Sequence, residues 1–283
     1  MLTKQIIDEA VLRALAEDAP WGDITSEYLI PPDATATASL VARESGVLAG
    51  IDVFAAAFRL VDPTVAVSIK ANDCEEFAKG QTLAVVSGNA RSILTAERVA
   101  LNFVQRMAGI ATATAKYVSA VAGTNARIVD TRKTTPGLRA FEKHSVRAGG
   151  GHNHRYSLSD AVMAKDNHLA VLTRGGKDLT TELKRVREQL GHTTHVEVEV
   201  DRLDQLPAVL AAGVDTIMLD NFSLEDMRLG VETIAGAAVV EASGGVNLDT
   251  VRAIAQTGVN VISVGALTHQ IQSLDLGLDV EIN

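Results

Sequence analysis

The sequence predicts an α/β protein with an N-terminal open α/β sandwich domain and a C-terminal α/β barrel. The chain has 283 residues, of which 47% are apolar, enough to bury one large core or two smaller ones. In the C-terminal part, short apolar runs typical of strands alternate with amphipathic segments typical of helices. The N-terminal third instead combines longer strand patterns with a few helical ones. These three observations favour two domains of different architecture.

The N-terminal third is predicted to form a small α/β layer domain. An amphipathic pattern predicts a helix over residues 4–16, followed by a turn at residues 20–23. The remaining patterns predict strands over 36–43, 65–70 and 82–87, and helices over 51–60 and 93–109. No Pro/Ser-rich linker marks the end of this domain, so we place its limits at residues 1–110.

Residues 111–269 are predicted to form the barrel. Helical patterns at 180–190, 203–212 and 248–256 lie between its apolar runs. Strands that alternate with helices pair in parallel, and six such units favour a TIM-like barrel, complete or incomplete, over an open sheet. The tail, residues 270–283, is expected to join the N-terminal domain. The six runs end at Asp130, Lys165, Glu199, Asp220, Ser243 and Gly265.

Composition excludes several classes of partner. The formal net charge of -9 and the lack of a basic tail argue against nucleic acid and anionic membranes. No run approaches the roughly 20 apolar residues of a membrane span, and charges interrupt the first twenty positions. The single Cys74 cannot form an intramolecular disulfide, and no Cys/His cluster suggests zinc. We therefore expect a cytoplasmic protein.

One segment is basic in this acidic chain. Residues 127–155 contain seven Lys or Arg against two acids, together with three consecutive glycines at 149–151. Each glycine disfavours an exposed helix by about 1 kcal/mol, so we expect a loop shaped around an anionic ligand. A solvated charged surface is the alternative.

The C-terminal strand ends are expected to converge on one end of the barrel, called here the mouth, where such folds carry their active site. Arginine and lysine at these ends suit carboxylate and phosphate oxygens. Glu199 and Asp220 suit sugar hydroxyls, Mg²⁺ or positive charge in a transition state. The glycine turns after the last two strands let backbone N–H groups approach a phosphate. A phosphorylated sugar and an acidic partner molecule fit all of these groups.

Nine segments together resemble the nicotinate-nucleotide pyrophosphorylase (carboxylating) family, also called quinolinate phosphoribosyltransferases. They are ALAEDAPWGDIT, AERVALNFVQRMAGIAT, DTRKTTPGLR, EKHSVRAGGGHNHR, AKDNH, EVEVD, MLDNF, EASGGV and SVGALTH. The resemblance implies a glycosyltransferase (pentosyltransferase) that moves phosphoribose from phosphoribosyl pyrophosphate (PRPP) to quinolinate with Mg²⁺. The products are nicotinate mononucleotide, pyrophosphate and CO2, in de novo NAD biosynthesis. It also implies a homodimer or higher oligomer whose active site is shared between subunits.

The resemblance also implies the roles of individual residues. Lys133, Glu199 and Asp220 are the catalytic candidates: Lys133 for pyrophosphate, and the two acids for ribose hydroxyls and as candidate ligands of Mg²⁺. The candidates for the two carboxylates of quinolinate are Arg132, His154, Arg155 and Lys165, with Arg98 entering from the neighbouring subunit. The candidates for the 5'-phosphate are Ser243, Gly244, Gly245, Gly265 and His269.

The resemblance leaves some alternatives. Arg106 competes with Arg98 for the intersubunit role, although the AER context favours Arg98. His144 stands where the family commonly has an aromatic residue. Other functions remain open: a paralogue linked to molybdenum uptake, an enzyme acting on nicotinate, a Schiff-base aldolase using Lys133 or Lys165, and a non-catalytic anion-binding barrel.

Overall fold

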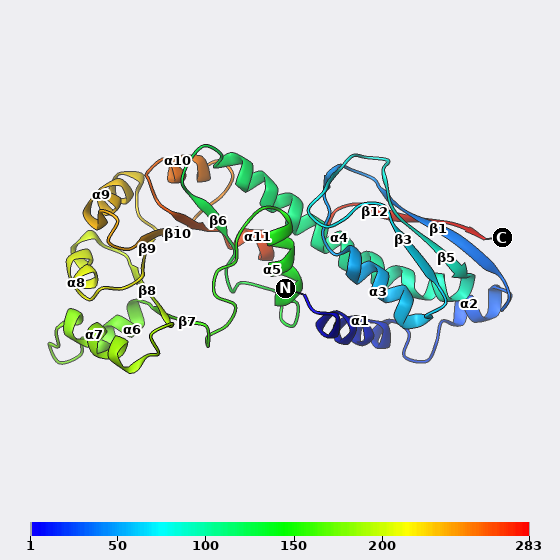
Figure 1. Ribbon diagram of the computed structural model, residues 1–283, viewed down its shortest axis with the longest axis horizontal. Coiled ribbons are helices and arrows are strands. Elements are labelled where there is room, and N and C mark those ends of the chain that lie inside the picture. Colours follow the sequence, from blue (N-terminus) through cyan, green and yellow to red (C-terminus); the bar gives the residue numbers. More distant parts are fainter. Residues whose placement is uncertain (1, 283) are drawn as a thin grey trace. The chain divides into compact units, whose positions relative to one another are not determined.

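The computed structural model describes residues 2–282, which form two compact units (Figure 1). Unit 1 comprises the residues up to Ala115, Thr135–Gly150 and the residues from Gln270 on; unit 2 comprises Lys116–Thr134 and Gly151–His269. The expected domain limits at 1 and 283 lie outside the described residues. Residues 135–150 belong to unit 1, although the sequence predicts them in the barrel domain.

Unit 1 is built on a four-stranded antiparallel sheet of order β12-β1-β5-β3 and a small β2-β4 pair. Its elements are α1 (Lys4–Asp18), α2 (Ile24–Leu29), β1 (Thr35–Ala42), β2 (Gly46–Val47), α3 (Ile51–Val61), β3 (Ala66–Ile69), β4 (Glu76–Phe77), β5 (Thr82–Asn89), α4 (Ala90–Ala120, whose last turns enter unit 2), α5 (Arg139–Ala148) and β12 (Leu276–Ile282).

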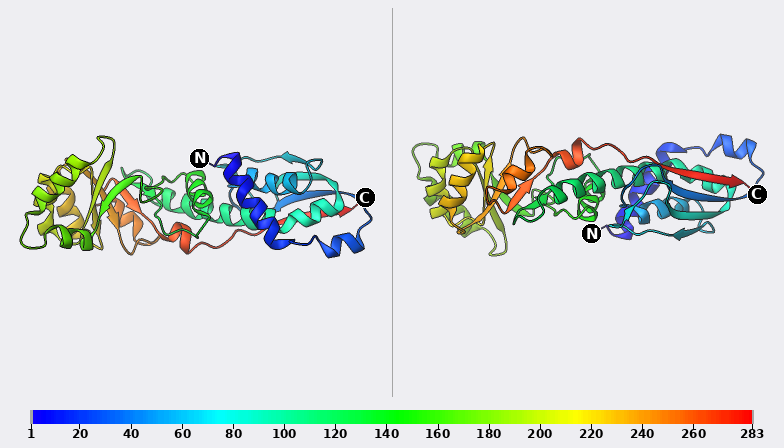
Figure 2. Two further views of the ribbon diagram at one scale, coloured as in Figure 1. Left: turned by 90° about the horizontal axis from the view of Figure 1, so that it is seen from below. Right: turned by 90° about the horizontal axis from the view of Figure 1, so that it is seen from above.

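The core of unit 1 follows from the period-two pattern of its strands. Every second residue of β1, such as Ala38 and Leu40, is fully buried and belongs to one apolar cluster with Phe54 and Phe58 of α3. Strand β1 pairs with β5 on one side and with β12 on the other. The β12 pairing covers seven residues, from Ala36↔Ile282 to Ala42↔Leu276. Figure 2 shows this red strand alongside the blue β1.

Helix α5 corrects one expectation from the sequence, because Arg139–Ala148 is helical and not a ligand-binding loop. The three glycines follow the end of the helix, so their cost does not apply to it. Phe141, Glu142 and Val146 of this helix are buried. Gly149 is required for close packing, since a Cβ there would lie 2.3 Å from the carbonyl oxygen of Ala111. Helix α2, which directly follows the expected turn at residues 20–23, is also not among the predicted helices.

Unit 2 is an incomplete α/β barrel of six strands, which confirms the predicted fold class. All six pair in parallel in the order β6-β11-β10-β9-β8-β7, with β6 and β7 at the two ends. Its elements are β6 (Arg127–Val129), β7 (Ala161–Ala164), α6 (Asp166–Leu172), α7 (Leu179–Gln189), β8 (His195–Val200), the 3₁₀-helix η1 (Leu203–Gln205), α8 (Leu206–Ala211), β9 (Thr216–Asp220), α9 (Leu224–Ile234), β10 (Val239–Ser243), α10 (Val251–Ala255), β11 (Val261–Ser263) and α11 (Ala266–His269).

The acids of the central barrel strands share the face that points inward, as the packing of β9 shows. Leu219 of β9 packs against α9, since a Cβ built on Gly230 of that helix would lie 3.0 Å from Leu219 Cδ1. Its neighbours Met218 and Asp220 therefore face the interior. Glu199 and Glu241 pair in register with Met218 and share its face. Figure 1 shows α8 and α9 on the outer side of the strands.

Candidate active site

The parallel strands bring the predicted site residues to one edge. Asp220 and Ser243 are the last residues of β9 and β10 and pair directly in register. Lys165 follows β7 at once, and Glu199 is the last residue but one of β8. All of the predicted site residues belong to unit 2 except Arg98, which lies on α4 in unit 1.

An ion pair connects two of these residues. Nζ of Lys165 lies 2.5 Å from Oε2 of Glu199, and the two side chains are 45% and 15% exposed. Lys165 caps α6 at its N-terminus, and its backbone N–H donates to Nδ1 of His168 at 3.0 Å. The cap fixes the backbone of Lys165 at the mouth, while its ammonium remains accessible to a ligand.

Lys133, Gly265 and His269 form a second group at the mouth. A Cβ built on Gly265 would lie 3.0 Å from Cδ of Lys133 and 3.4 Å from Nε2 of His269. Thr268 of α11 connects this helix to the loop after β6, because its hydroxyl donates to the carbonyl oxygen of Lys133 at 2.6 Å. Two potentially cationic side chains therefore flank a glycine at the N-terminus of α11, in an arrangement suited to phosphate.

The turn after β10 approaches the end of β9 closely. Gly244 has φ +94°, and a Cβ on it would lie 2.1 Å from Oδ1 of Asn221. Asn221 donates from Nδ2 to Oδ2 of Asp220 at 2.8 Å and from its backbone N–H to the carbonyl of Ser243 at 2.9 Å. Gly244 therefore has both a conformational and a steric reason to be glycine.

Arg155 interacts electrostatically with Arg132. Burial and the positive charge of Arg132 both lower the pKa of Arg155. Arg155 is anchored by a bond from Nη1 to the carbonyl of Ala161, the first residue of β7, at 2.8 Å. Neighbouring guanidinium groups repel each other, and an anionic ligand would relieve that repulsion.

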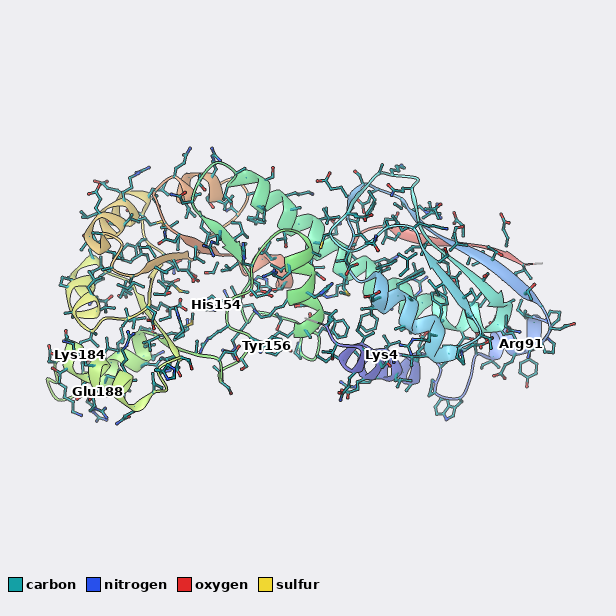
Figure 3. The ribbon with its side chains drawn as sticks, in the orientation of Figure 1. Lys4, Arg91, His154, Tyr156, Lys184 and Glu188 are labelled. Atoms are coloured by element: carbon teal, nitrogen blue, oxygen red, sulfur yellow. The ribbon has the colours of Figure 1, made fainter. Side chains whose placement is uncertain are left out.

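His154 lies between two buried carboxylates and can be located in Figure 3. Its Nε2 is 3.2 Å from Oε2 of Glu197 and 3.5 Å from Oε1 of Glu241, and both glutamates are 3% exposed. Burial lowers the pKa of His154, but the contacts with the two carboxylates outweigh it and raise the pKa to about 10.

A contact on the other ring nitrogen of His154 acts in the opposite sense. Nδ1 accepts a hydrogen bond from the backbone N–H of Arg155 at 2.7 Å, which requires an unprotonated nitrogen and favours the neutral ring. A neutral ring that accepts at Nδ1 can still donate from Nε2–H toward the carboxylates, so the geometry accommodates both sets of contacts. The carboxylates and the Arg155 N–H therefore favour opposite charge states of the ring.

Two acids of this site were not identified from the sequence, and a third, Asp130, was predicted only as the end of a strand. Glu197 and Glu241 contact His154, and buried Asp130 accepts bonds from His154 N at 2.9 Å and Asn153 Nδ2 at 2.6 Å. The EVEV alternation of β8 was a usable signal, since glutamates spaced by two share one face of a strand. Glu241 had no such signal, because VVEAS contains a single acid.

Two cavities lie in unit 2. One of about 410 Å³ is lined by the loop that carries His154 and Arg155, by Glu197 and Glu241, and by strand-start residues that the second cavity shares, namely Arg127, His195 and Val261. The other, of about 910 Å³, is lined by residues at the N-terminal ends of the strands, such as Arg127 and Asp215. The larger cavity therefore lies at the end of the strands opposite to the predicted site.

In unit 1, Arg98 and Arg106 occupy different surroundings. Arg106 forms an ion pair with buried Glu142 at 2.5 Å and donates to the hydroxyl of Thr135 at 2.8 Å. Arg98 is exposed, and within the described residues no hydrogen bond or ion pair engages its side chain. Arg106 thus stabilises its own unit, whereas Arg98 is available to a ligand or partner.

The fold and the mouth define an incomplete α/β barrel with a mixed cationic and acidic site for anionic ligands. Two family descriptions match the chain: "Quinolinate phosphoribosyl transferase, C-terminal domain" over residues 110–279, and the N-terminal domain of the same family over residues 23–108. The chain belongs to the quinolinate phosphoribosyl transferase family.

Individual relatives agree over the full length. The chain is 42% identical over 281 residues to the nicotinate-nucleotide pyrophosphorylase [carboxylating] of Mycobacterium leprae, covering 96% of each. It is 43% identical to the chloroplastic enzyme of that name from Arabidopsis thaliana, covering 96% of this chain and 82% of the plant protein. The crystal structure of NadC from Streptococcus pyogenes is similar with a TM-score of 0.94 and 40% identity, covering 100% of this chain and 98% of that one.

Among residues 2–282, no helix is both long enough and apolar enough to cross a membrane.

Proposed function

We propose that the protein transfers phosphoribose from PRPP to the ring nitrogen of quinolinate and releases CO2, giving nicotinate mononucleotide and pyrophosphate in de novo NAD biosynthesis. One observation carries the proposal: two cationic groups occupy the mouth, with Glu199 and Asp220 as the acids of the same site. Arg132 and Arg155 form one, and Lys133 and His269 beside Gly265 form the other. A dicarboxylate acceptor and a phosphorylated donor would each bind to one of these two cationic groups.

The acceptor's two carboxylates are assigned to Arg132, Arg155, Lys165 and His154. The adjacent guanidinium groups and the half-exposed ammonium of Lys165 support this role. His154 also holds the backbone of Arg155 in place, since its Nδ1 accepts a hydrogen bond from the Arg155 N–H. Lys165 exchanges its contact with Glu199 for one with a carboxylate when the acceptor binds.

The donor's phosphates are assigned to the turns after β10 and β11. Ser243, Gly244 and Gly245 receive the 5'-phosphate together with Gly265 and His269, and Lys133 contacts the pyrophosphate. Support comes from Gly244 and Gly245, whose φ values of +94° and +62° are suited to glycine, and from the approach of Lys133 to Gly265. Backbone N–H groups in such turns bind phosphate oxygens without a side chain in the way.

Charge explains how the site would promote the transfer. The ring nitrogen forms a bond to C1 of the ribose as the C1–oxygen bond breaks and pyrophosphate leaves. Glu199 and Asp220 stabilise the positive charge that develops at C1, and Lys133 stabilises the departing pyrophosphate. The ribosylated ring is a cation, so it accepts the electrons of the bond to the neighbouring carboxylate. CO2 then leaves, and the ring carbon takes a proton from water.

The acids also fit a Mg²⁺ ion. Oδ2 of Asp220 accepts from Asn221, and Oε2 of Glu199 pairs with Lys165, so each carboxylate has a second oxygen that the described residues do not engage. Carboxylate oxygens are the protein ligands that Mg²⁺ prefers. Glu199 and Asp220 would hold the ion together with oxygens of PRPP, and the bound ion would neutralise part of the pyrophosphate charge.

We also propose a cytoplasmic homodimer with shared active sites. Trp21, Ile24 and Tyr28 are between 71% and 94% exposed, and an exposed apolar patch marks an interface. Asp23, the N-cap of α2, accepts a bond from Thr95 on α4 at 3.2 Å, so the patch begins beside the turn that carries Arg98. A two-fold interface through this patch would direct Arg98 toward the partner's mouth.

The acceptor decides between this function and its rivals. The protein is incubated with Mg²⁺ and PRPP plus either quinolinate or nicotinate, and nicotinate mononucleotide is quantified by mass spectrometry. We expect product from quinolinate and little from nicotinate, because a single carboxylate cannot engage all of the cations. Product from nicotinate alone, or no product with PRPP bound, would contradict the proposal. A Schiff-base aldolase would instead be trapped at Lys133 or Lys165 by borohydride with a carbonyl substrate.

A further inference from the structure

We propose that Glu197 and Glu241 are positioning residues, which fix His154, and through it Arg155, for binding the acceptor. The family resemblance assigns neither glutamate to the site. The inference rests on the proposed function, because it concerns how the carboxylates of quinolinate are bound.

The two buried glutamates need a donor as partner. A carboxylate removed from water is strongly disfavoured unless it is paired and hydrogen-bonded, and burial accordingly raises the pKa of Glu197. Within the described residues, the ion pairs of Glu197 and of Glu241 both go to Nε2 of His154, at 3.2 and 3.5 Å. The two acids reach this nitrogen from β8 and β10, the strands on either side of β9, and so restrict the ring from two directions.

The restraint passes from His154 to the residues around it. The backbone N–H of His154 donates to Asp130 after β6, and that of Arg155 donates to Nδ1 of the His154 ring. The guanidinium of Arg155 in turn bonds the carbonyl of Ala161 at the start of β7. Residues 154 and 155 therefore span the open side of the barrel between β6 and β7, fastened to both. Glu197 and Glu241 are the contacts of this segment with the opposite strands.

A metal ion is the other occupant that this cluster could hold, since His154, Glu197 and Glu241 offer ligand atoms within 4.8 Å of one another. The charges disfavour it. Glu197 already interacts with the positive charge of Arg155 as well as with His154. A divalent cation would be placed beside these positive groups and would compete with them for the same two carboxylates. Oε1 of Glu197 and Oε1 of Glu241 have no hydrogen-bond partner within the described residues, and burial raises the pKa of Glu197, so elemental analysis is part of the test.

The test replaces one glutamate and leaves its shape. In Glu241→Gln, we expect quinolinate affinity, measured by isothermal titration, to fall about tenfold, and PRPP affinity and kcat at saturating quinolinate to stay within about twofold. Thr216→Val is the matched control, because Thr216 is buried on β9, lines the same cavity and bonds His195 at 2.8 Å rather than His154. This control should bind quinolinate like the parent. Glu197→Gln provides the same test if Glu241→Gln does not fold.

A double-mutant cycle decides whether the glutamate acts through His154. In a His154→Ala background, Glu241→Gln should cause no further loss of quinolinate affinity, because its partner is already absent. Losses that simply add would overturn the inference, as would unchanged affinity in both Glu→Gln variants. Stoichiometric metal found by elemental analysis in the parent and lost in Glu241→Gln would also overturn it. Titration is independent of turnover, so a parent that binds quinolinate but forms no product refutes the proposed function and not this role.

Discussion

The ammonium of Lys165 contacts the carboxylate of Glu199 at 2.5 Å, so a residue assigned to the acceptor pairs with one assigned to the donor. The pair forms without any substrate, across the neighbouring strands β7 and β8. Acceptor binding would draw Lys165 away from Glu199, and the carboxylate of Glu199 would then be able to interact with the ribose. Occupation of one half of the mouth therefore prepares the other half.

Lys165→Met tests this relationship. Because Lys165 is 45% exposed, the pair should contribute no more than about 1 kcal/mol to the free energy of unfolding, so the melting temperature should change little. The free energy of quinolinate binding should become less favourable by about 2 to 5 kcal/mol, the usual effect of removing one partner of a charge-assisted pair. Lys184→Met, which removes an exposed lysine of α7, is the control (Figure 3). Equal quinolinate affinity in the two variants would contradict the assignment.

Asp220→Asn should affect turnover more than binding. The change preserves the shape of a side chain at the end of β9 and removes the charge proposed to stabilise C1 of the ribose. Interactions made mainly in the transition state reduce kcat and leave substrate affinity nearly intact. Steady-state kinetics would show this, with Asp249→Asn, an exposed acid, as the control. A parent-like kcat in Asp220→Asn would rule out the role.

Gly244→Ala separates backbone strain from a steric clash at the phosphate turn. Gly236→Ala is the matched control: Gly236 has φ +79° but open space around its missing Cβ, whereas Gly244 has φ +94° and Asn221 at 2.1 Å. Both variants should lose about 1 kcal/mol of stability from strain. Only Gly244→Ala should also lose PRPP affinity, because it displaces Asn221 beside Asp220. Parallel titrations with PRPP check this, and equal PRPP affinity would show that the turn is not the phosphate site.

The pH dependence of stability tests the charge of His154. The pKa of this residue is raised from 6.5 to about 10 in the folded protein, so its stabilising effect is full below pH 6.5 and is lost as pH rises to about 10. The difference in unfolding free energy between the parent and His154→Gln should shrink over that window, by up to about 1.4 kcal/mol per pH unit. Urea titrations at several pH values measure it. A difference that does not vary with pH would mean that the ring is neutral.

Complementation tests the shared site. Arg98→Ala and Lys165→Ala should each be inactive alone, since every site then lacks one acceptor contact. After subunit exchange, a mixed dimer carries both lesions in one site and neither in the other, so activity should return toward one working site per dimer. Exchange is verified by native mass spectrometry. If mixed dimers form and stay inactive, Arg98 does not cross to the partner.

Much of the fold could be predicted because period-two and helical patterns report burial directly. The six strand ends of the barrel follow from apolar runs that stop at polar residues, and the incomplete barrel agrees with that interpretation. Helix α5 could not be predicted in this way. Its charged face and the following glycines are typical of a loop, and only the packing of Phe141, Val146 and Gly149 within unit 1 explains why it is helical.

The candidate site was predictable only where residue type alone indicated chemistry. Arg132, Lys165 and Asp220 lie at strand ends, where a charged side chain is conspicuous in the sequence. Glu241 lies two residues before the end of β10, and its proposed role depends on a contact with His154, which is 87 residues away in the chain. Contacts of that kind come from the register of the barrel and not from any local pattern.

One measurement tests the central claim most directly. Quinolinate labelled with ¹³C in the carboxylate beside the ring nitrogen is incubated with the protein, PRPP and Mg²⁺, and ¹³CO2, pyrophosphate and nicotinate mononucleotide are quantified together. The account predicts equal amounts of all three, and no ¹³CO2 when PRPP is omitted. Pyrophosphate released without ¹³CO2, or ¹³CO2 released without PRPP, would contradict it.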